Sequence, residues 1–309
     1  LARTVEELRG VLAPERRAGQ TVGLVPTMGA LHEGHLSLVE RAREQCEVVV
    51  VSLFVNPAQF GESADLERYP RREEQDAKLL ERAGADVLFA PSVEEVYPRG
   101  FATQVQVLGV SEPLEGAARG PEHFRGVATV VAKLLGMVQP DVAYFGQKDA
   151  QQVLVIRRLV ADLNLPVRVE VCPTLRESDG LAMSSRNALL DPAARVRARC
   201  LYAGLRAAAE LAAAGERSAE VLLDAARAPL ARSQVDPEYL VLVDPETLEP
   251  LRELDRPALL TLAARIGGVR LIDNLTLHPT RAPAQVARKP APTPKGKRTR
   301  GKAEVVCSA

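Results

Sequence analysis

Two histidines in one short segment have the clearest potential for chemistry in this chain. The segment reads PTMGALHEGH from Pro26 to His35, and it contains His32 and His35, two of the chain's four histidines. Because they are three positions apart, they share one face of a helix that begins there. Imidazoles on a shared face can donate hydrogen bonds to charge that develops on a phosphate. The alternative is an ordinary connection that carries two surface histidines.

The residues on either side of this segment predict the structure that would position the histidines. Residues 21–25 are an apolar run typical of a buried strand, and residues 36–43 have the spacing of an amphipathic helix. Gly29 and Gly34 stand at the junction, where the backbone can pass close to a ligand. A strand, a tight turn and a helix direct free backbone N–H groups and the positive end of the helix dipole to one place, which suits a phosphate.

Polar side chains follow two further predicted strands, at 47–55 and 141–145. The first run is too apolar for a half-exposed strand and is typical of a parallel sheet covered on both faces. Ligands of open α/β sheets bind at the carboxyl ends of such strands. We therefore expect the following side chains to gather beside the two histidines: Asn56, Gln59, Lys148, Asp149 and Gln152.

The order of the predicted elements indicates an α/β fold with a doubly wound, Rossmann-like parallel sheet. Residues 115–126 contain glycines, a proline and two arginines, and we expect a loop with anion-binding potential. A short strand is expected at 103–108. Residues 146–152 are predicted to form the turn after the strand at 141–145, and a helix should follow this turn and end near 163. The other helices are predicted at 4–18, 73–83 and 127–138, and the remaining strands at 86–90 and 167–171.

The character of the sequence changes after Pro173, and the second part predicts a smaller C-terminal α+β domain. Residues 174–187 are polar and loop-like, and they include Met183-Ser184-Ser185-Arg186, two hydroxyls followed by a guanidinium. We expect three regions: 1–174, 175–278, and a basic disordered tail at 279–309. The second region has predicted helices at 191–214 and 218–230 and predicted strands at 238–243, 258–265 and 269–277.

Composition narrows the class of protein. The chain has 309 residues, 46% hydrophobic and 26% charged, as in soluble globular proteins. No apolar run reaches 18 residues, so no membrane span is expected, and the charged N-terminus does not predict a secretory signal. Cys46, Cys172, Cys200 and Cys307 are scattered without metal or redox spacing, which predicts reduced thiols and a cytoplasmic protein.

Charge is unevenly distributed along the chain. Residues 279–309 hold eight Lys or Arg and one acid, a net charge of +7, so the other 278 residues carry −7. A body that acidic is a poor general binder of nucleic acid, so an anionic substrate must be held by a few placed cations. Together the histidines, the lysine, the arginine and the glutamines suit nucleotidyl transfer, in which a carboxylate or phosphate attacks the α-phosphate of a nucleotide.

Five stretches make the chain resemble a known family over residues 3 to 277. The chain resembles the pantothenate synthetases (pantoate–β-alanine ligases), a family of the HxGH nucleotidyltransferase superfamily. The stretches are PTMGALHEGH at 26–35, FVNPAQF at 54–60, HFRGV at 123–127, GQKDAQQ at 146–152 and DGLAMSSRN at 179–187.

The resemblance implies an ATP-dependent ligase. Members of the family join (R)-pantoate to β-alanine through a pantoyl-adenylate, release AMP and pyrophosphate, require Mg²⁺ and are typically homodimers. The resemblance makes His35 the proton donor, with His32, Lys148 and Arg186 as the other catalytic residues. Gln59 and Gln152, with Asn56 near them, would bind pantoate. The resemblance does not identify metal ligands. ATP would be bound by Met28, Gly29, Ala30, Leu31, His32, Glu33, Gly34, His35, Gly146, Gln147, Lys148, Asp149, Leu175, Met183, Ser184, Ser185 and Arg186.

Two other readings remain open at this point. Another HxGH cytidylyl- or adenylyltransferase would stop at the nucleotidylated product, and it would have no need for the paired glutamines. A tRNA-handling or nucleic-acid-binding protein is suggested by the HxGH turn, the Met183-Ser184-Ser185-Arg186 loop and the basic tail. The acidic body argues against it, and we expect neither a nucleic-acid partner for the folded part nor a membrane partner.

Truncation after Leu277 should leave the melting temperature and the turnover almost unchanged, because a segment rich in proline and lysine makes few core contacts. Thermal unfolding and steady-state kinetics of the full and truncated chains measure this. A large drop in melting temperature on truncation would contradict the prediction.

Overall fold

The computed structural model describes residues 1–60, 66–67 and 69–280. The predicted basic tail lies outside the described residues from position 281 onward. Among the described helices, none is both long enough and apolar enough to cross a membrane.

The larger part of the chain forms a five-stranded sheet in which every pairing is parallel. The strand order is β3-β2-β1-β4-β5. The chain therefore moves outward from β1 in one direction, then returns and moves outward in the other, so the order reverses between β1 and β4. The strands are β1 (Val22–Thr27), β2 (Val48–Leu53), β3 (Val87–Phe89), β4 (Val142–Gly146) and β5 (Arg168–Cys172).

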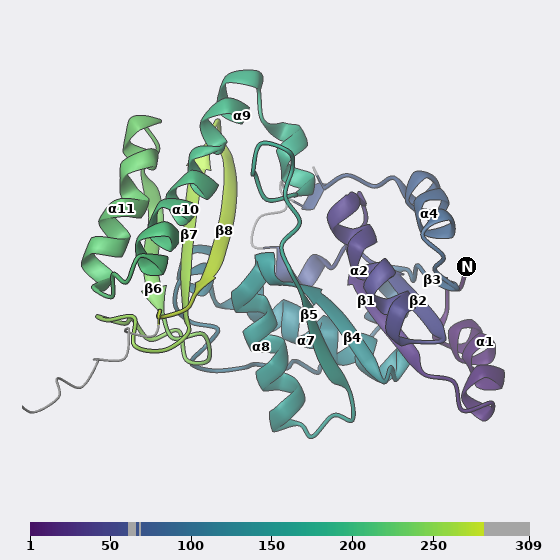
Figure 1. Cartoon of the computed structure of the whole chain (residues 1–309). Helices are drawn as coiled ribbons and strands as arrows, with labels where there is room; N and C mark the ends of the chain where they lie inside the picture. The colour runs from purple at the N-terminus through teal and green to yellow at the C-terminus, as the bar shows by residue number, and fades with distance from the viewer. Residues whose placement is uncertain (61–65, 68, 281–309) are drawn as a thin grey trace, which may run out of the picture.

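Helices cover both faces of this sheet (Figure 1). Leu24 and Val50 point to the face that packs with α1 (Val5–Arg17), α7 (Pro121–Val138) and α8 (Ala150–Asp162). Val25 and Val51 point to the opposite face, against α2 (Glu33–Gln45) and α4 (Glu73–Arg82). Successive strand residues alternate between faces, so a sheet buried on both sides needs continuous apolar strands. The predicted doubly wound α/β fold is confirmed.

A smaller domain with its own apolar core follows (Figure 1, green to yellow). Its sheet is antiparallel with the order β6-β7-β8, and helices pack against it. The elements are α9 (Pro192–Ala198), α10 (Cys200–Ala213), α11 (Ala219–Arg232), β6 (Pro237–Val243), β7 (Ala258–Ile266) and β8 (Val269–Leu277). The prediction of a smaller C-terminal α+β domain is confirmed. Its predicted bounds, residues 175–278, stay a prediction.

Short elements connect the main ones. Three residues separate the end of β2 from η1 (Pro57–Gln59), and η2 (Gln147–Asp149) follows β4 directly. A third, η3 (Ser185–Leu189), ends the polar segment that follows β5. Among the described residues there are also two short helices, α5 (Val93–Val96) and α6 (Glu115–Arg119).

Three local predictions are wrong. Residues 103–108 form no strand; the Val105 N–H donates to Thr129 Oγ1 of α7 at 2.9 Å, which ties this segment to a helix. The expected loop at 115–126 is instead α6 followed by the start of α7, because Pro121 fits the first turn of a helix, where its missing N–H costs nothing. The helix predicted at 191–214 is divided at Arg199 into α9 and α10.

Candidate functional site

A cavity of about 280 Å³ opens at the carboxyl ends of β1 and β4 and extends to the small domain. It therefore lies where the strand order reverses, the usual ligand position in such sheets. Gly29, Ala30, Leu31, Glu33 and Gln147 are predicted ATP residues that do not line it. The predicted residues that do line it are Met28, His32, Gly34, His35, Asn56, Gln59, Gly146, Lys148, Asp149, Gln152, Leu175, Met183, Ser184, Ser185 and Arg186.

The two histidines are held by the backbone of their own turn. His32 caps the N-terminus of α2, and its Nδ1 accepts the Gly34 N–H at 3.1 Å. His35 Nδ1 in turn accepts the His32 N–H at 3.4 Å, and the two ring centroids are 4.1 Å apart. A Cβ at position 34 would lie 2.9 Å from two atoms of the His32 ring. The glycine between the histidines is thus required for the first ring to fold back on the helix.

This hydrogen bonding fixes the protonation of both rings. An Nδ1 that accepts a backbone N–H leaves the proton of the neutral imidazole on Nε2. Burial, and after it the charge of His32, lowers the pKa of His35 to about 3. Burial, and after it the charge of Lys148, also lowers the pKa of His32. Both rings are therefore neutral Nε2–H donors at pH 7.

A carboxylate that the sequence analysis missed shapes the same turn. Asp76 of α4 is buried, and its two oxygens accept the backbone N–H groups of Ala30 and Leu31 at 2.8 and 2.9 Å. Ala30 has a φ of 52°, in the left-handed region that alanine rarely adopts, so the two bonds offset a strained backbone. Asp76 lies one turn before the buried Leu80, and an acid on the apolar side of a predicted helix was the available signal.

Gln59 is supported by the residues around η1. Asn56 is buried, and its Nδ2 donates to Gln59 Oε1 at 3.0 Å and to Gly126 O at 3.1 Å. Tyr97 donates its hydroxyl proton to Asn56 Oδ1 at 2.8 Å. The Asn56 amide is therefore engaged with protein groups, so it positions Gln59. Helix α7 contacts η1 directly, because a Cβ at position 126 would lie 2.2 Å from Ala58 O.

Three predicted residues come from the turn after β4. Lys148 Nζ lies 3.3 Å from Asp149 Oδ1, and the lysine side chain is 19% exposed. Gln152, in the first turn of α8, also lines the cavity. Within the described ranges its amide has no hydrogen-bond partner, so it is available to a ligand.

The segment after β5 is tied down at several points. Arg195 pairs with Glu177 at 2.6 Å and with Asp179 at 2.7 Å. The Met183 N–H donates to Leu175 O at 3.0 Å. Ser184 caps η3 by accepting the Arg186 N–H at 3.3 Å. These contacts bring the predicted Met183–Arg186 stretch to the cavity.

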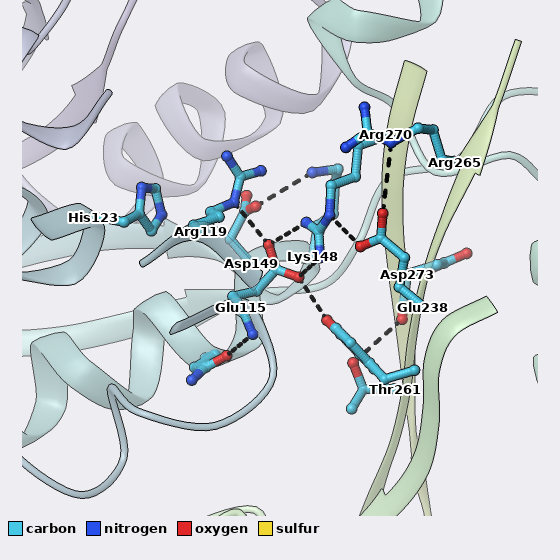
Figure 2. A network of polar contacts seen from close by, with 12 residues as sticks. Glu115, Arg119, His123, Lys148, Asp149, Glu238, Thr261, Arg265, Arg270 and Asp273 are labelled. Atoms are coloured by element: carbon cyan, nitrogen blue, oxygen red, sulfur yellow. Dashed lines mark hydrogen bonds and ion pairs between the residues drawn. The ribbon is translucent and has the colours of Figure 1, made fainter. Parts of the chain in front are cut away.

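Figure 2 shows a charged network on the small-domain side of the cavity that the sequence analysis also missed. Arg270 of β8 forms two hydrogen bonds to the Glu115 carboxylate, at 2.6 and 2.7 Å. Arg119 donates its Nε–H to the same carboxylate at 2.9 Å, and Tyr239 donates its hydroxyl at 2.8 Å. Glu238 pairs with Arg270 at 2.6 Å. The buried carboxylate therefore joins α6 to the small sheet.

The arginines control the ionisation of Glu115. Burial alone would raise the pKa of this carboxyl, but hydrogen bonds and charge from Arg270, and then from Arg119, outweigh burial and lower the pKa to about 2. Burial has the opposite effect on a histidine, because it disfavours the protonated ring. Burial, and after it the charge of Arg119, lowers the pKa of the nearby His123 to about 4. At neutral pH the network thus pairs the carboxylates of Glu115 and Glu238 with the guanidinium groups of Arg270 and Arg119, and the neutral imidazole of His123 lies nearby.

Comparisons with known proteins agree on one family. The model of the family described as pantoate-beta-alanine ligase matches residues 1–276. A pantothenate synthetase from Cereibacter sphaeroides is 56% identical over 273 residues, which cover 88% of this chain and 98% of the relative. Another from Thermotoga petrophila is 52% identical over 275 residues, 89% of this chain and 98% of the relative.

Solved structures give the same result. The pantothenate synthetase of Thermus thermophilus has a TM-score of 0.85 and 52% identity, covering 90% of this chain and 99% of that one. The pantoate-beta-alanine ligase of Francisella tularensis, complexed with beta-gamma ATP and beta-alanine, has a TM-score of 0.73 and 35% identity. That match covers 89% of this chain and 96% of the Francisella chain.

Replacing Glu115 with Gln should destabilise the protein at neutral pH and remove one source of its acid sensitivity. A carboxyl whose pKa falls from 4.5 to about 2 on folding adds stability above pH 4.5, and that stability is lost as the pH falls toward 2. The shift corresponds to about 3 kcal/mol. Urea unfolding of both proteins at pH 7, 5 and 3 measures the difference.

The matched control is Glu210→Gln, which breaks an exposed ion pair with Arg206 and should change stability little. If the Glu115→Gln variant unfolds with the same free energy and the same pH dependence as the original protein, the network does not contribute in this way.

Proposed function

The chain belongs to the pantoate–β-alanine ligase family, and we propose that it joins pantoate to β-alanine at the cavity between β1, β4 and the small domain. One observation supports this most. The same cavity is lined by the histidine turn, by Lys148 and Arg186, and by Gln59 and Gln152. Cationic and N–H groups suit the phosphates of ATP, and the amides suit a substrate with hydroxyls and a carboxylate.

The reaction has two steps. A carboxylate oxygen of pantoate attacks the α-phosphorus of ATP, the bond from that phosphorus to the bridging oxygen breaks, and pyrophosphate leaves. The neutral amine of β-alanine then attacks the acyl carbon of the pantoyl-adenylate, loses a proton and displaces AMP. No covalent bond to the protein forms, so catalysis consists of positioning and charge stabilisation.

The histidines act on the first step. His32 and His35 would each donate one Nε2–H to the phosphate oxygens of ATP. Negative charge grows on these oxygens as pyrophosphate departs. A donor that is already oriented and neutral needs no rearrangement when that charge develops. Lys148 and Arg186 would stabilise the same oxygens with full positive charges. The proposed ATP site consists of the predicted nucleotide-binding residues that line the cavity, with Leu175 beside the adenine.

Gln59 and Gln152 are proposed to bind pantoate from two sides. The Gln152 amide offers two donors and one acceptor. Gln59 is held in place by Asn56 and by Met28 Sδ, each at 3.0 Å, which leaves its second N–H and one oxygen lone pair for a ligand. We propose Asn56 as a positioning residue for Gln59. The paired amides also favour the ligase over another HxGH cytidylyl- or adenylyltransferase, which would have no use for a second substrate of this kind.

We propose that Mg²⁺ arrives with ATP. The described residues contain no group of three His, Cys, Asp or Glu side chains that could hold a metal ion. Mg²⁺ commonly binds substrate phosphates, waters and one or two carboxylates, and Asp149 is a carboxylate that lines the cavity. The donor set fits that mode, in which the ion would neutralise phosphate charge.

Other expectations from the sequence and from the family likeness stay proposals. These are the homodimer, the cytoplasmic location, the absence of a nucleic-acid partner for the body, and the boundary between residues 174 and 175. The direct test of the activity is incubation of the protein with ATP, pantoate and β-alanine, with mass detection of products. Pantothenate and AMP should form in equal amounts, and nucleotidylated pantoate accumulating without pantothenate would contradict a ligase.

Replacing His35 with Ala should lower pyrophosphate release by about 10²–10³-fold, because one oriented donor to the transition state is lost. His278, an exposed histidine at the end of β8, provides the matched control as His278→Ala. Pantoate-dependent pyrophosphate release and thermal unfolding of both variants are measured. Near-normal release by a folded His35→Ala variant would refute the assigned role.

Replacing Gln59 or Gln152 with Ala should raise the apparent KM for pantoate far more than that for ATP. A site whose amides hydrogen-bond a substrate binds that substrate much more weakly when one of the bonds cannot form, by up to ~10⁴-fold. Gln106→Ala is the control, because Gln106 is exposed and does not line the cavity. Equal losses for ATP and pantoate would remove the reason for placing pantoate there.

A further inference from the structure

Asn274 of β8 holds the lysine turn from the small-domain side. Its Nδ2 donates to the backbone carbonyls of Gln147 at 3.0 Å and Lys148 at 2.9 Å. Its Oδ1 accepts the side-chain amide of Gln147 at 3.2 Å. Asn274 is only 3% exposed, so these bonds are shielded from water. The amide thus uses both donors and its acceptor on η2, the element that carries Lys148.

The preceding residue of β8 holds the other cation-bearing segment. Asp273 is 1% exposed and pairs with Arg176 through two hydrogen bonds, at 2.6 and 2.9 Å. The Arg176 guanidinium also lies over the ring of Tyr202 in α10, 3.8 Å from its centroid. Arg176 belongs to the same segment as Met183–Arg186, and it donates to Gly180 O at 3.2 Å. That segment is therefore anchored to the small domain near its start.

One short piece of strand consequently serves both loops. Successive side chains of a strand point to opposite sides, so one residue can engage η2 while its neighbour engages the segment after β5. β8 is rigid at this point, because Asp273 and Asn274 lie opposite Leu262 and Thr261 in the continuous ladder with β7. The backbone N–H of Asn274 also donates to Asp273 Oδ1 at 2.8 Å.

We propose that Asp273 and Asn274 are positioning residues that set the spacing between Lys148 and Arg186 across the ATP triphosphate. The inference rests on the proposed function, in which those two cations bind phosphate oxygens. In this proposal the small domain does more than enclose the nucleotide site, because it also positions the two cations that bind the triphosphate. We call the contacts of Asp273 with the segment after β5 and of Asn274 with η2 the brace. A charge displaced by about 1 Å from its working position can cost roughly 10²-fold in rate, so loss of the brace should slow the reaction.

Two variants of Asn274 test the proposal. Asn274→Ala removes all three bonds to η2. Asn274→Asp keeps the shape and the acceptor but turns an oxygen toward the carbonyls of Gln147 and Lys148. Both should lower kcat/KM for ATP by about 10- to 100-fold, whereas the KM for pantoate should change less than about twofold. Equal changes in the KM values of both substrates, or no change in folded variants, would overturn the proposal.

A double-mutant cycle separates positioning from general damage. If Asn274 acts through Lys148, then Asn274→Ala should cost less than about threefold when Lys148 is already alanine. Full additivity of the two losses would contradict the brace.

The matched control is Thr129→Val. Thr129 is also buried, and its hydroxyl accepts the Val105 N–H at 2.9 Å and donates to Arg125 O at 2.7 Å. The valine variant loses both bonds. It should lower the melting temperature and leave kcat/KM for ATP unchanged. A loss equal to that of Asn274→Ala would show that destabilisation alone explains the effect.

Calorimetry can measure the binding of a non-hydrolysable ATP analogue to the original chain and to the Asn274→Ala variant. This measurement does not depend on whether the protein forms pantothenate. Weaker binding by the variant supports the brace even if the original chain makes no pantothenate, which would defeat only the proposed function. Equal affinity in both proteins contradicts the brace.

Discussion

The site depends on the hydrogen bonds that shape the turn between β1 and α2. Asp76 accepts two consecutive backbone N–H groups there, and the two histidine Nδ1 atoms accept two more. These four bonds fix the backbone, the orientation of both rings and their tautomers together. Because each Nδ1 is occupied, the one group that each neutral ring can offer to a substrate is its Nε2–H.

The topology then determines what can meet this turn. The strand order reverses between β1 and β4, so the turn after β1 and the lysine turn after β4 are neighbours, and η1 follows from β2 on the other side. The small domain completes the cavity through β8, whose residues contact both η2 and the segment after β5. A buried carboxylate, Glu115, ties α6 to that same small sheet.

The parts that could be predicted from sequence are those carried by local patterns. The continuous apolar run at 47–55 and the strand–turn–helix pattern around His32 each specify one element, and residue order alone placed Gln59 and Lys148 at one sheet edge. The missed residues act through long-range pairing. Asp76 contacts residues 45 and 46 positions away, and Glu115 pairs with Arg270, 155 positions away. Residues 115–126 were misread because their glycines and Pro121 favour loops locally, while packing of α7 on η1 favours a helix.

The most direct test of this account is the protonation of the two histidines. Nitrogen NMR of protein labelled at the imidazoles, recorded from pH 7 to pH 4 and assigned with single histidine variants, reports the charge and tautomer of each ring. The account predicts that His32 and His35 both carry their proton on Nε2 at pH 7 and that His35 stays neutral throughout, because its pKa is lowered to about 3. A His35 ring that titrates near the ordinary value of 6.5, or that carries its proton on Nδ1, would contradict it.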